Sequence, residues 1–120
     1  MRNQPKYHIL KNTTYALNGL KDLLKNETSF RIELFFSFIL IPIIFIIDTS
    51  LIYKIIMFIT LMGVLIAETI NSSIERVVDL VTVEQHPMAG RAKDIGSTIV
   101  FLSIILFLVT WIIIILDILI

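Results

Sequence analysis

Apolar residues in this chain are concentrated in three long runs, separated by short polar segments, at positions 34–47, 51–67 and 95–116. A helix of ~20 residues crosses the ~30 Å hydrocarbon core of a bilayer, and each run approaches that length once its flanks are added. The pattern therefore predicts an all-α membrane protein with transmembrane helices over 30–48, 51–82 and 95–117. The linker between the first two is so short that they should form an antiparallel hairpin.

A different pattern precedes the first run. Between Thr13 and Asn26 the leucines gather on one helical face and the lysines on the other. Such a helix suits the headgroup plane, with its lysines toward anionic lipid. We predict an N-terminal amphipathic surface helix; a helix packed in the cytoplasm is the alternative. The whole chain, 1–120, is then one membrane domain, with 1–29 cytoplasmic or interfacial and 83–94 a cytoplasmic loop.

Composition and charge add a location and an orientation. The chain is 57% hydrophobic with a mean hydropathy of +0.91, too apolar for a soluble domain of 120 residues. Cations are concentrated before the first run and in the loop after the second, so the N-terminus is expected in the cytoplasm and the C-terminus outside. Trp111 is expected at the outer interface. Because the chain has no cysteine, disulfides and thiolate sites are excluded.

The second predicted helix carries a polar stripe on one face, which leaves the membrane at its cytoplasmic end. Its members are Glu68, Asn71, Ser72, Glu75 and Asp79. A carboxylate as deep as Glu68 costs a few kcal/mol to insert, and such groups usually face a bundle interior. A general base is one interpretation, and a structural hydrogen bond to a neighbouring helix is the other. The companions of Glu68 on the same face favour function.

Glu75 and Glu27 should lie at the depth of the lipid headgroups. Two carboxylates there could bind a hard divalent cation together with nucleotide phosphates, because Mg²⁺ favours one or two carboxylates plus substrate oxygens. Taken singly, each is more often a salt-bridged surface residue. Lys93 could steady phosphates, while Asp79 could simply pair with Arg76 or Arg91. The chain has no Gly-x-x-x-x-Gly-Lys loop and no basic-aromatic surface for nucleic acid.

Two longer segments resemble the small bacterial integral-membrane diacylglycerol kinases. They read Glu-Thr-Ile-Asn-Ser-Ser-Ile-Glu-Arg-Val-Val-Asp at 68–79 and Gly-Arg-Ala-Lys-Asp-Ile-Gly-Ser at 90–97, and Asn-Glu-Thr-Ser-Phe-Arg-Ile-Glu at 26–33 supports them. The resemblance implies a homotrimer of three-span subunits in the bacterial inner membrane. It also implies transfer of the γ-phosphate of MgATP to diacylglycerol, which gives phosphatidic acid.

The resemblance also assigns roles residue by residue. Glu68 matches the catalytic base, Asn71 its polar neighbour, and Glu27 and Glu75 the carboxylates that hold the metal on ATP. The positions that match other ATP contacts are Tyr15, Glu84, Gln85, His86, Lys93 and Asp94. Those near the lipid substrate are His8, Phe30, Arg31, Ile32, Glu33 and Ser97. The chain departs from the family at His8, where Arg is usual, and at Ala16, where Ser is common.

Two alternatives remain at this point. Undecaprenol kinases share the Glu-x-x-Asn-x-x-x-Glu core, so the acceptor lipid is open, although the Phe-Arg-Ile-Glu and Gly-Arg-Ala-Lys-Asp segments look closer to the diacylglycerol branch. A non-enzymatic transporter subunit could use Glu68 as a proton or ion site. Transporters generally have inverted repeats or more spans, and neither is evident in this sequence.

Overall fold

The computed structural model describes residues 8–120, and these contain four helices and no strand. The helices are α1 Ile9–Asn26, α2 Thr28–Ile46, α3 Leu51–Val81 and α4 Pro87–Leu119. The last three are long and apolar enough to cross a membrane. The prediction of an all-α chain with three candidate spans is therefore confirmed. Residues 1–7 of the predicted cytoplasmic segment 1–29 lie outside the described residues.

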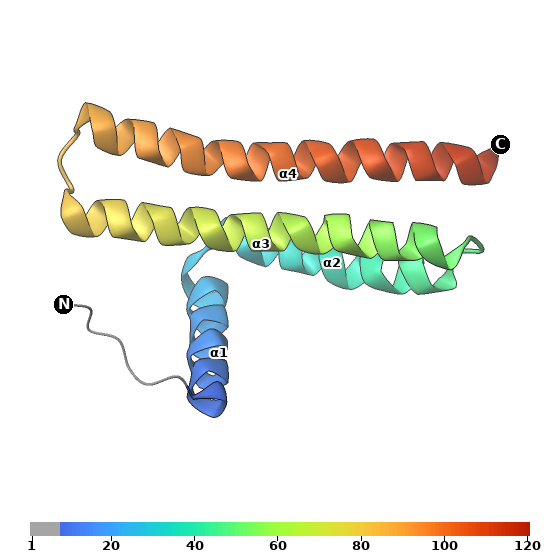
Figure 1. Ribbon diagram of the computed structural model, residues 1–120, viewed down its shortest axis with the longest axis horizontal. Helices are drawn as coiled ribbons and strands as arrows, with labels where there is room; N and C mark the ends of the chain where they lie inside the picture. The colour runs from blue at the N-terminus through green and yellow to red at the C-terminus, as the bar shows by residue number, and fades with distance from the viewer. Residues whose placement is uncertain (1–7) are drawn as a thin grey trace.

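Helix α3 is the central element of the arrangement (Figure 1). It packs antiparallel against α2 on one side and against α4 on the other, with its more extensive contact to α4. Its 31 residues span about 47 Å, more than the hydrocarbon core requires. Helix α1 runs across the direction of the other three helices, beside the start of α2 (Figure 1). A helix that lies in a membrane surface is expected to run across the spans in this way.

An apolar cluster holds the three long helices together toward the end that contains the α2–α3 turn and the C-terminus. It comprises Ile44 of α2, Met57 and Leu61 of α3, and Trp111 and Ile114 of α4. The indole nitrogen of Trp111 is hydrogen-bonded inside the cluster. Its Nε1–H donates to the Met57 carbonyl and to Thr60 Oγ1, each at 3.2 Å. Trp111 is therefore a buried packing residue whose hydrogen-bond acceptors lie on α3. Its expected depth, at the outer interface, stays a prediction.

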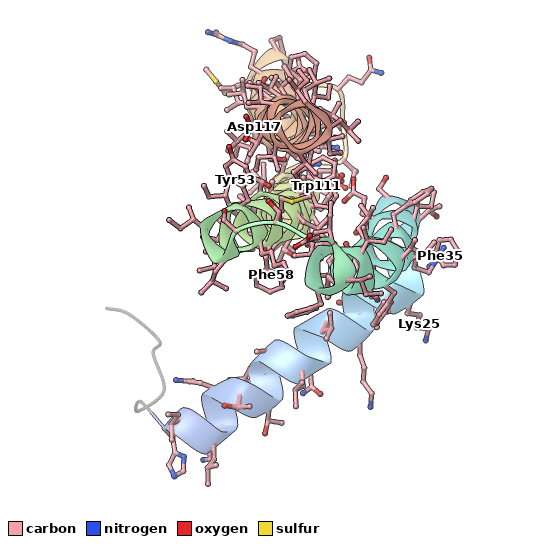
Figure 2. All side chains as sticks on the ribbon, turned by 90° about the vertical axis from the view of Figure 1, so that its right-hand side faces the viewer. Lys25, Phe35, Tyr53, Phe58, Trp111 and Asp117 are labelled. Carbon is pink, nitrogen blue, oxygen red and sulfur yellow. The ribbon has the colours of Figure 1, made fainter. Side chains whose placement is uncertain are left out.

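The outward faces of the same helices remain apolar and exposed. Figure 2 shows Phe35 on α2 and Phe58 on α3 pointing away from the bundle, and both rings are exposed. In water such a surface would be unstable, so these faces suit lipid or a second copy of the chain.

A second cluster docks α1 onto the bundle. Leu23 of α1 and Phe30 of α2 are buried against Leu65 of α3. The short connection at Glu27 is fixed by Arg31, whose Nη1 donates to the carbonyls of Leu24 and Lys25, both at 2.9 Å. These carbonyls are among the unpaired acceptors at the end of α1, so Arg31 acts as its C-terminal cap.

Helix α4 begins earlier than the hydropathy predicts. Pro87 occupies its first turn, and His86 precedes it as an N-cap whose Nδ1 accepts from the Met88 N–H at 3.1 Å. Proline is well suited to this position because its missing N–H would be unpaired in any case. Most of the segment predicted as a cytoplasmic loop, 83–94, is therefore helical, and α3 and α4 are joined by only five residues, 82–86.

Candidate functional site

Two carboxyl groups from different helices meet inside the bundle. Glu68 of α3 is 9% exposed, and its carboxyl group lies beside that of Glu33 on α2. Glu33 Oε2 is buried and has no hydrogen-bond partner. Carboxyl groups are among the side chains that act in general acid–base chemistry, so this pair is a candidate for it.

An apolar cavity of about 320 Å³ adjoins this pair. Helices α2, α3 and α4 all contribute to its walls, and Glu33 and Ser37 are its polar lining residues. The Ser37 hydroxyl already donates to the Glu33 carbonyl at 2.7 Å, which leaves the Glu33 carboxyl as the ionisable group in the cavity wall. An apolar cavity with one acidic residue in its wall fits a molecule that has an apolar body and a single polar end.

Further polar contacts lie along α3 toward its C-terminal end. One turn from Glu68, Asn71 Nδ2 donates to Glu75 Oε1 at 3.2 Å. Lys93 of α4 is close enough to Glu75 to interact with its charge, and Lys93 Nζ lies 2.7 Å from Asp79 Oδ1. Asp79 therefore pairs with Lys93, and not with Arg76 or Arg91 as expected. The pattern of α3 alone could not reveal this, because the partner lies on another helix.

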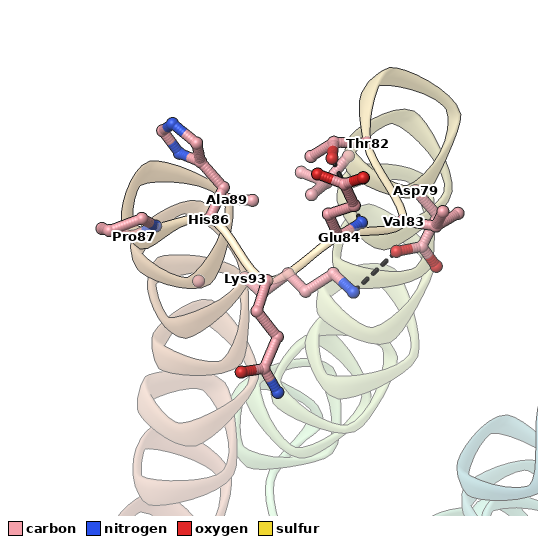
Figure 3. Close-up of a pocket in the computed structure, with 11 residues that line it drawn as sticks. Asp79, Thr82, Val83, Glu84, His86, Pro87, Ala89 and Lys93 are labelled. Atoms are coloured by element: carbon pink, nitrogen blue, oxygen red, sulfur yellow. Dashed lines mark hydrogen bonds and ion pairs between the residues drawn. The ribbon is translucent and has the colours of Figure 1, made fainter.

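These contacts end at a larger cavity of about 530 Å³ where α3 passes into α4 (Figure 3). Its walls include Asp79 and Lys93, which are joined by the dashed contact in the figure, and the loop residues Glu84, Gln85 and His86. The loop is held by the Glu84 N–H, which donates to Thr82 Oγ1 at 3.2 Å. Four of the residues that the resemblance assigns to ATP thus line one cavity.

Glu27 occupies the junction between α1 and α2 and is held by an arginine that sequence reasoning did not assign to the site. Arg76 Nη2 lies 3.1 Å from Glu27 Oε1, and Arg76 Nη1 pairs with Asp22 of α1. Hydrogen bonds from Asn26 and then Arg76 hold the pKa of Asp22 below its usual value. Arg76 follows Glu75 directly in the chain, so Glu27 reaches the turn of α3 that carries the other predicted metal ligand.

The other predicted residues lie apart from these contacts. Phe30 is buried in the α1 docking cluster, where it has a packing role, and Arg31 caps the end of α1. His8 precedes α1 as its exposed N-cap residue. The remaining four are exposed on α1, α2 or α4: Tyr15, Ile32, Asp94 and Ser97.

A divalent metal fits the site only together with other ligands. Among residues 8–120, no group of three or more His, Asp or Glu side chains is arranged to hold a metal. Glu75 and Glu27 are the candidate ligands, engaged by Asn71 and Arg76 respectively. Mg²⁺ commonly takes one or two carboxylates and completes its shell with water and phosphate oxygens, so the donor set fits a metal that arrives with a nucleotide.

Comparison with known proteins identifies the family. The family model for prokaryotic diacylglycerol kinase matches residues 14–115. The chain belongs to the prokaryotic diacylglycerol kinase family. The match contains both cavities, the Glu68–Glu33 pair and Arg76, whereas His8 precedes it.

Individual relatives agree with this assignment. The diacylglycerol kinase of Haemophilus influenzae is 41% identical over 104 residues, which cover 87% of this chain and 88% of that protein. That of Escherichia coli K12 is 37% identical over 103 residues, which cover 86% and 84%. The undecaprenol kinase of Bacillus subtilis is 28% identical over 89 residues, which cover 74% and 72%. Membership of this family makes the chain a kinase, and the transporter alternative is set aside.

Proposed function

We propose that this protein is a lipid kinase that transfers the γ-phosphate of MgATP to the hydroxyl of diacylglycerol and forms phosphatidic acid. The observation that supports this most strongly is the place of Glu68. Its buried carboxyl lies beside Glu33, which lines an apolar cavity, and further along α3 the contacts of Asn71, Glu75 and Lys93 lead to the loop cavity. An apolar alcohol and a water-borne phosphate donor could meet along this part of α3.

At the lipid end, the acyl chains occupy the bilayer and the apolar cavity, and the free hydroxyl reaches Glu68. Glu68 accepts the hydroxyl proton as the oxygen attacks the γ-phosphorus, and the bond from phosphorus to the bridging oxygen of ADP breaks. The transferred proton neutralises the carboxylate of Glu68, which lies beside Glu33. Ile32 and Ser97 contact the lipid from their exposed faces.

At the nucleotide end, ATP binds in the loop cavity against Glu84, Gln85 and His86, with Tyr15 and Asp94 as further contacts. Lys93 neutralises phosphate charge. Glu75 and Glu27 would hold the Mg²⁺ that accompanies ATP, and the metal would offset charge on the transferring group. In this structure Glu27 is paired with Arg76, so its carboxylate would have to leave that ion pair to bind the metal.

The reaction takes place at the cytoplasmic face of the bacterial inner membrane. Cations near α1 and the α3–α4 loop favour the cytoplasmic side for both, which places the C-terminus in the periplasm. One chain alone leaves much apolar surface exposed. Only 17%, 39% and 11% of the residues in the most apolar stretches of α2, α3 and α4 are buried. We propose a homotrimer in which subunits cover these faces.

A coupled ADP assay on the purified protein in detergent micelles tests the function. ATP consumption should require both Mg²⁺ and added diacylglycerol, and phosphatidic acid should form in equal amount. Undecaprenol is the second acceptor to test, because an undecaprenol kinase is among the relatives. A clear preference for undecaprenol at matched mole fraction would show that undecaprenol, and not diacylglycerol, is the acceptor. ATP consumption that no lipid alcohol stimulates would contradict the proposal.

A further inference from the structure

Gly96 on α4 is buried against the polar stripe of α3. A Cβ atom built on Gly96 would lie 2.4 Å from Asn71 Oδ1, with Asn71 Cγ and Ile74 Cδ1 both at 3.6 Å. Real Cβ atoms do not approach an oxygen this closely. The amide group of Asn71 therefore occupies the space that any other residue at position 96 would fill.

The orientation of the Asn71 amide explains why this space matters. Its Nδ2 donates to Glu75 Oε1 at 3.2 Å, and a carboxylate can only accept hydrogen bonds. The amide oxygen must then point the other way, toward α4, where Oδ1 is buried without a conventional partner. One Cα hydrogen of Gly96 lies in the direction of the missing Cβ and faces this oxygen, the arrangement of a weak Cα–H···O contact.

We infer that Gly96 is a positioning residue, which holds the Asn71 amide in the orientation that directs Glu75 toward the metal on the nucleotide. The inference rests on the proposed function, in which Glu75 is a ligand of MgATP. A methyl group at position 96 would force the amide off α4. Asn71 would then lose its bond to Glu75, and the carboxylate would be free to turn.

The chain offers a matched control. Gly63 lies in α3, and a Cβ built there meets no atom within 4 Å. Gly63→Ala therefore makes the same chemical change in a helix of the same bundle without a clash. Gly90 also has free space, but it lines the loop cavity and is unsuitable as a neutral control.

The first measurement is a double-mutant cycle on thermal stability, which needs no enzymatic activity. Gly96→Ala should lower the melting temperature in the wild-type background. It should have little effect in the Asn71→Ala background, where the colliding amide is gone. Equal losses in the two backgrounds would overturn the contact, whether or not the protein is a kinase.

The second measurement is a Mg²⁺ titration of diacylglycerol-dependent activity. Loss of a partner that orients a metal ligand typically costs about 10- to 100-fold in metal affinity or activity. Gly96→Ala should raise the half-saturating Mg²⁺ concentration about tenfold or more, while Gly63→Ala leaves it unchanged. A loss of maximal rate with no change in that concentration would show a purely structural glycine and overturn the positioning role. If the wild type itself shows no activity while the stability cycle succeeds, the proposed function fails and the contact stands.

Discussion

At the scale of single residues, the site contains buried polar atoms that lack hydrogen-bond partners. Glu33 Oε2 and Asn71 Oδ1 are buried without partners, and Glu68 is nearly buried beside another carboxyl. Buried polar groups of this kind are costly and usually have a functional reason. Here the three residues lie between the apolar cavity and the loop cavity proposed to bind the nucleotide.

Glu75 can be tested separately from the proton-accepting residue. Changing Glu75 to Ala removes a proposed metal ligand and leaves Asn71 without its acceptor. We expect the half-saturating Mg²⁺ concentration to rise at least about tenfold, since a carboxylate is among the few protein ligands available. The measurement is activity across a Mg²⁺ series at constant ATP. An unchanged Mg²⁺ dependence would remove Glu75 from the metal site.

The sequence allowed the residues of α3 to be identified but not their partners. Spacing along one helix was enough to predict that Glu68, Asn71 and Glu75 share a face, because helical geometry is local. The contacts of Arg76 with Asp22 and Glu27 depend on how α1 docks, across gaps of 54 and 49 positions. Gly96 was missed for the same reason. A glycine has no side chain to suggest a role, and its role appears only when the neighbouring helix is in place.

At the scale of elements, α1 is fastened to the bundle by one apolar cluster and by two arginines, Arg31 and Arg76. Leu23 and Phe30 pack on Leu65, while Arg76 joins α1 and the α1–α2 junction to α3. The sequence predicted a helix in this region, and the structure extends it to Ile9. The start of α4 was misplaced because hydropathy marks where a helix becomes apolar, whereas His86 and Pro87 mark where it begins.

The pH dependence of α1 docking follows from Asp22. Its pKa is lowered in the folded protein, so its contribution to docking is present above the ordinary pKa of an aspartate and is lost as the pH falls through the lowered value. Docking should therefore be constant between about pH 8 and pH 5, since an aspartate ordinarily titrates near 3.9. A nitroxide label at Leu20→Cys reports this, because Leu20 lines the groove between α1 and α3 and the chain has no other cysteine.

The neutral variant Asp22→Asn should make this label more mobile at pH 7, since it removes the charge that pairs with Arg76. The control is Asp48→Asn, the same change at the distant α2–α3 turn. A label equally immobile in both variants would mean that the apolar cluster docks α1 without help from the ion pair.

At the scale of the whole molecule, the exposed apolar faces require a covering. Helices α2 and α4 bury little of their apolar surface within one chain, and part of it must meet lipid or another subunit. Nothing in the sequence of one chain fixes the number of subunits; the value three comes from the family resemblance. Small contact residues and packing, rather than hydrophobicity, drive such association in a bilayer.

Light scattering on the detergent-solubilised protein, corrected for bound detergent, tests the assembly. We expect a protein mass three times the 13.8 kDa of one chain. A single-chain mass in a preparation that retains full activity would exclude the trimer as the working unit.

In the proposed reaction, Glu68 takes the proton from a membrane-embedded alcohol during phosphoryl transfer. The most direct measurement follows a radioactive γ-phosphate from MgATP into phosphatidic acid, in bilayers that contain diacylglycerol, for the wild type and for Glu68→Gln. Glutamine keeps the size of the side chain but cannot act as the base, and loss of a general base costs about 10²- to 10⁴-fold. We predict that label transfer falls at least about 100-fold while nucleotide binding persists. Label transfer within a few fold of the wild-type rate would show that Glu68 is not the base.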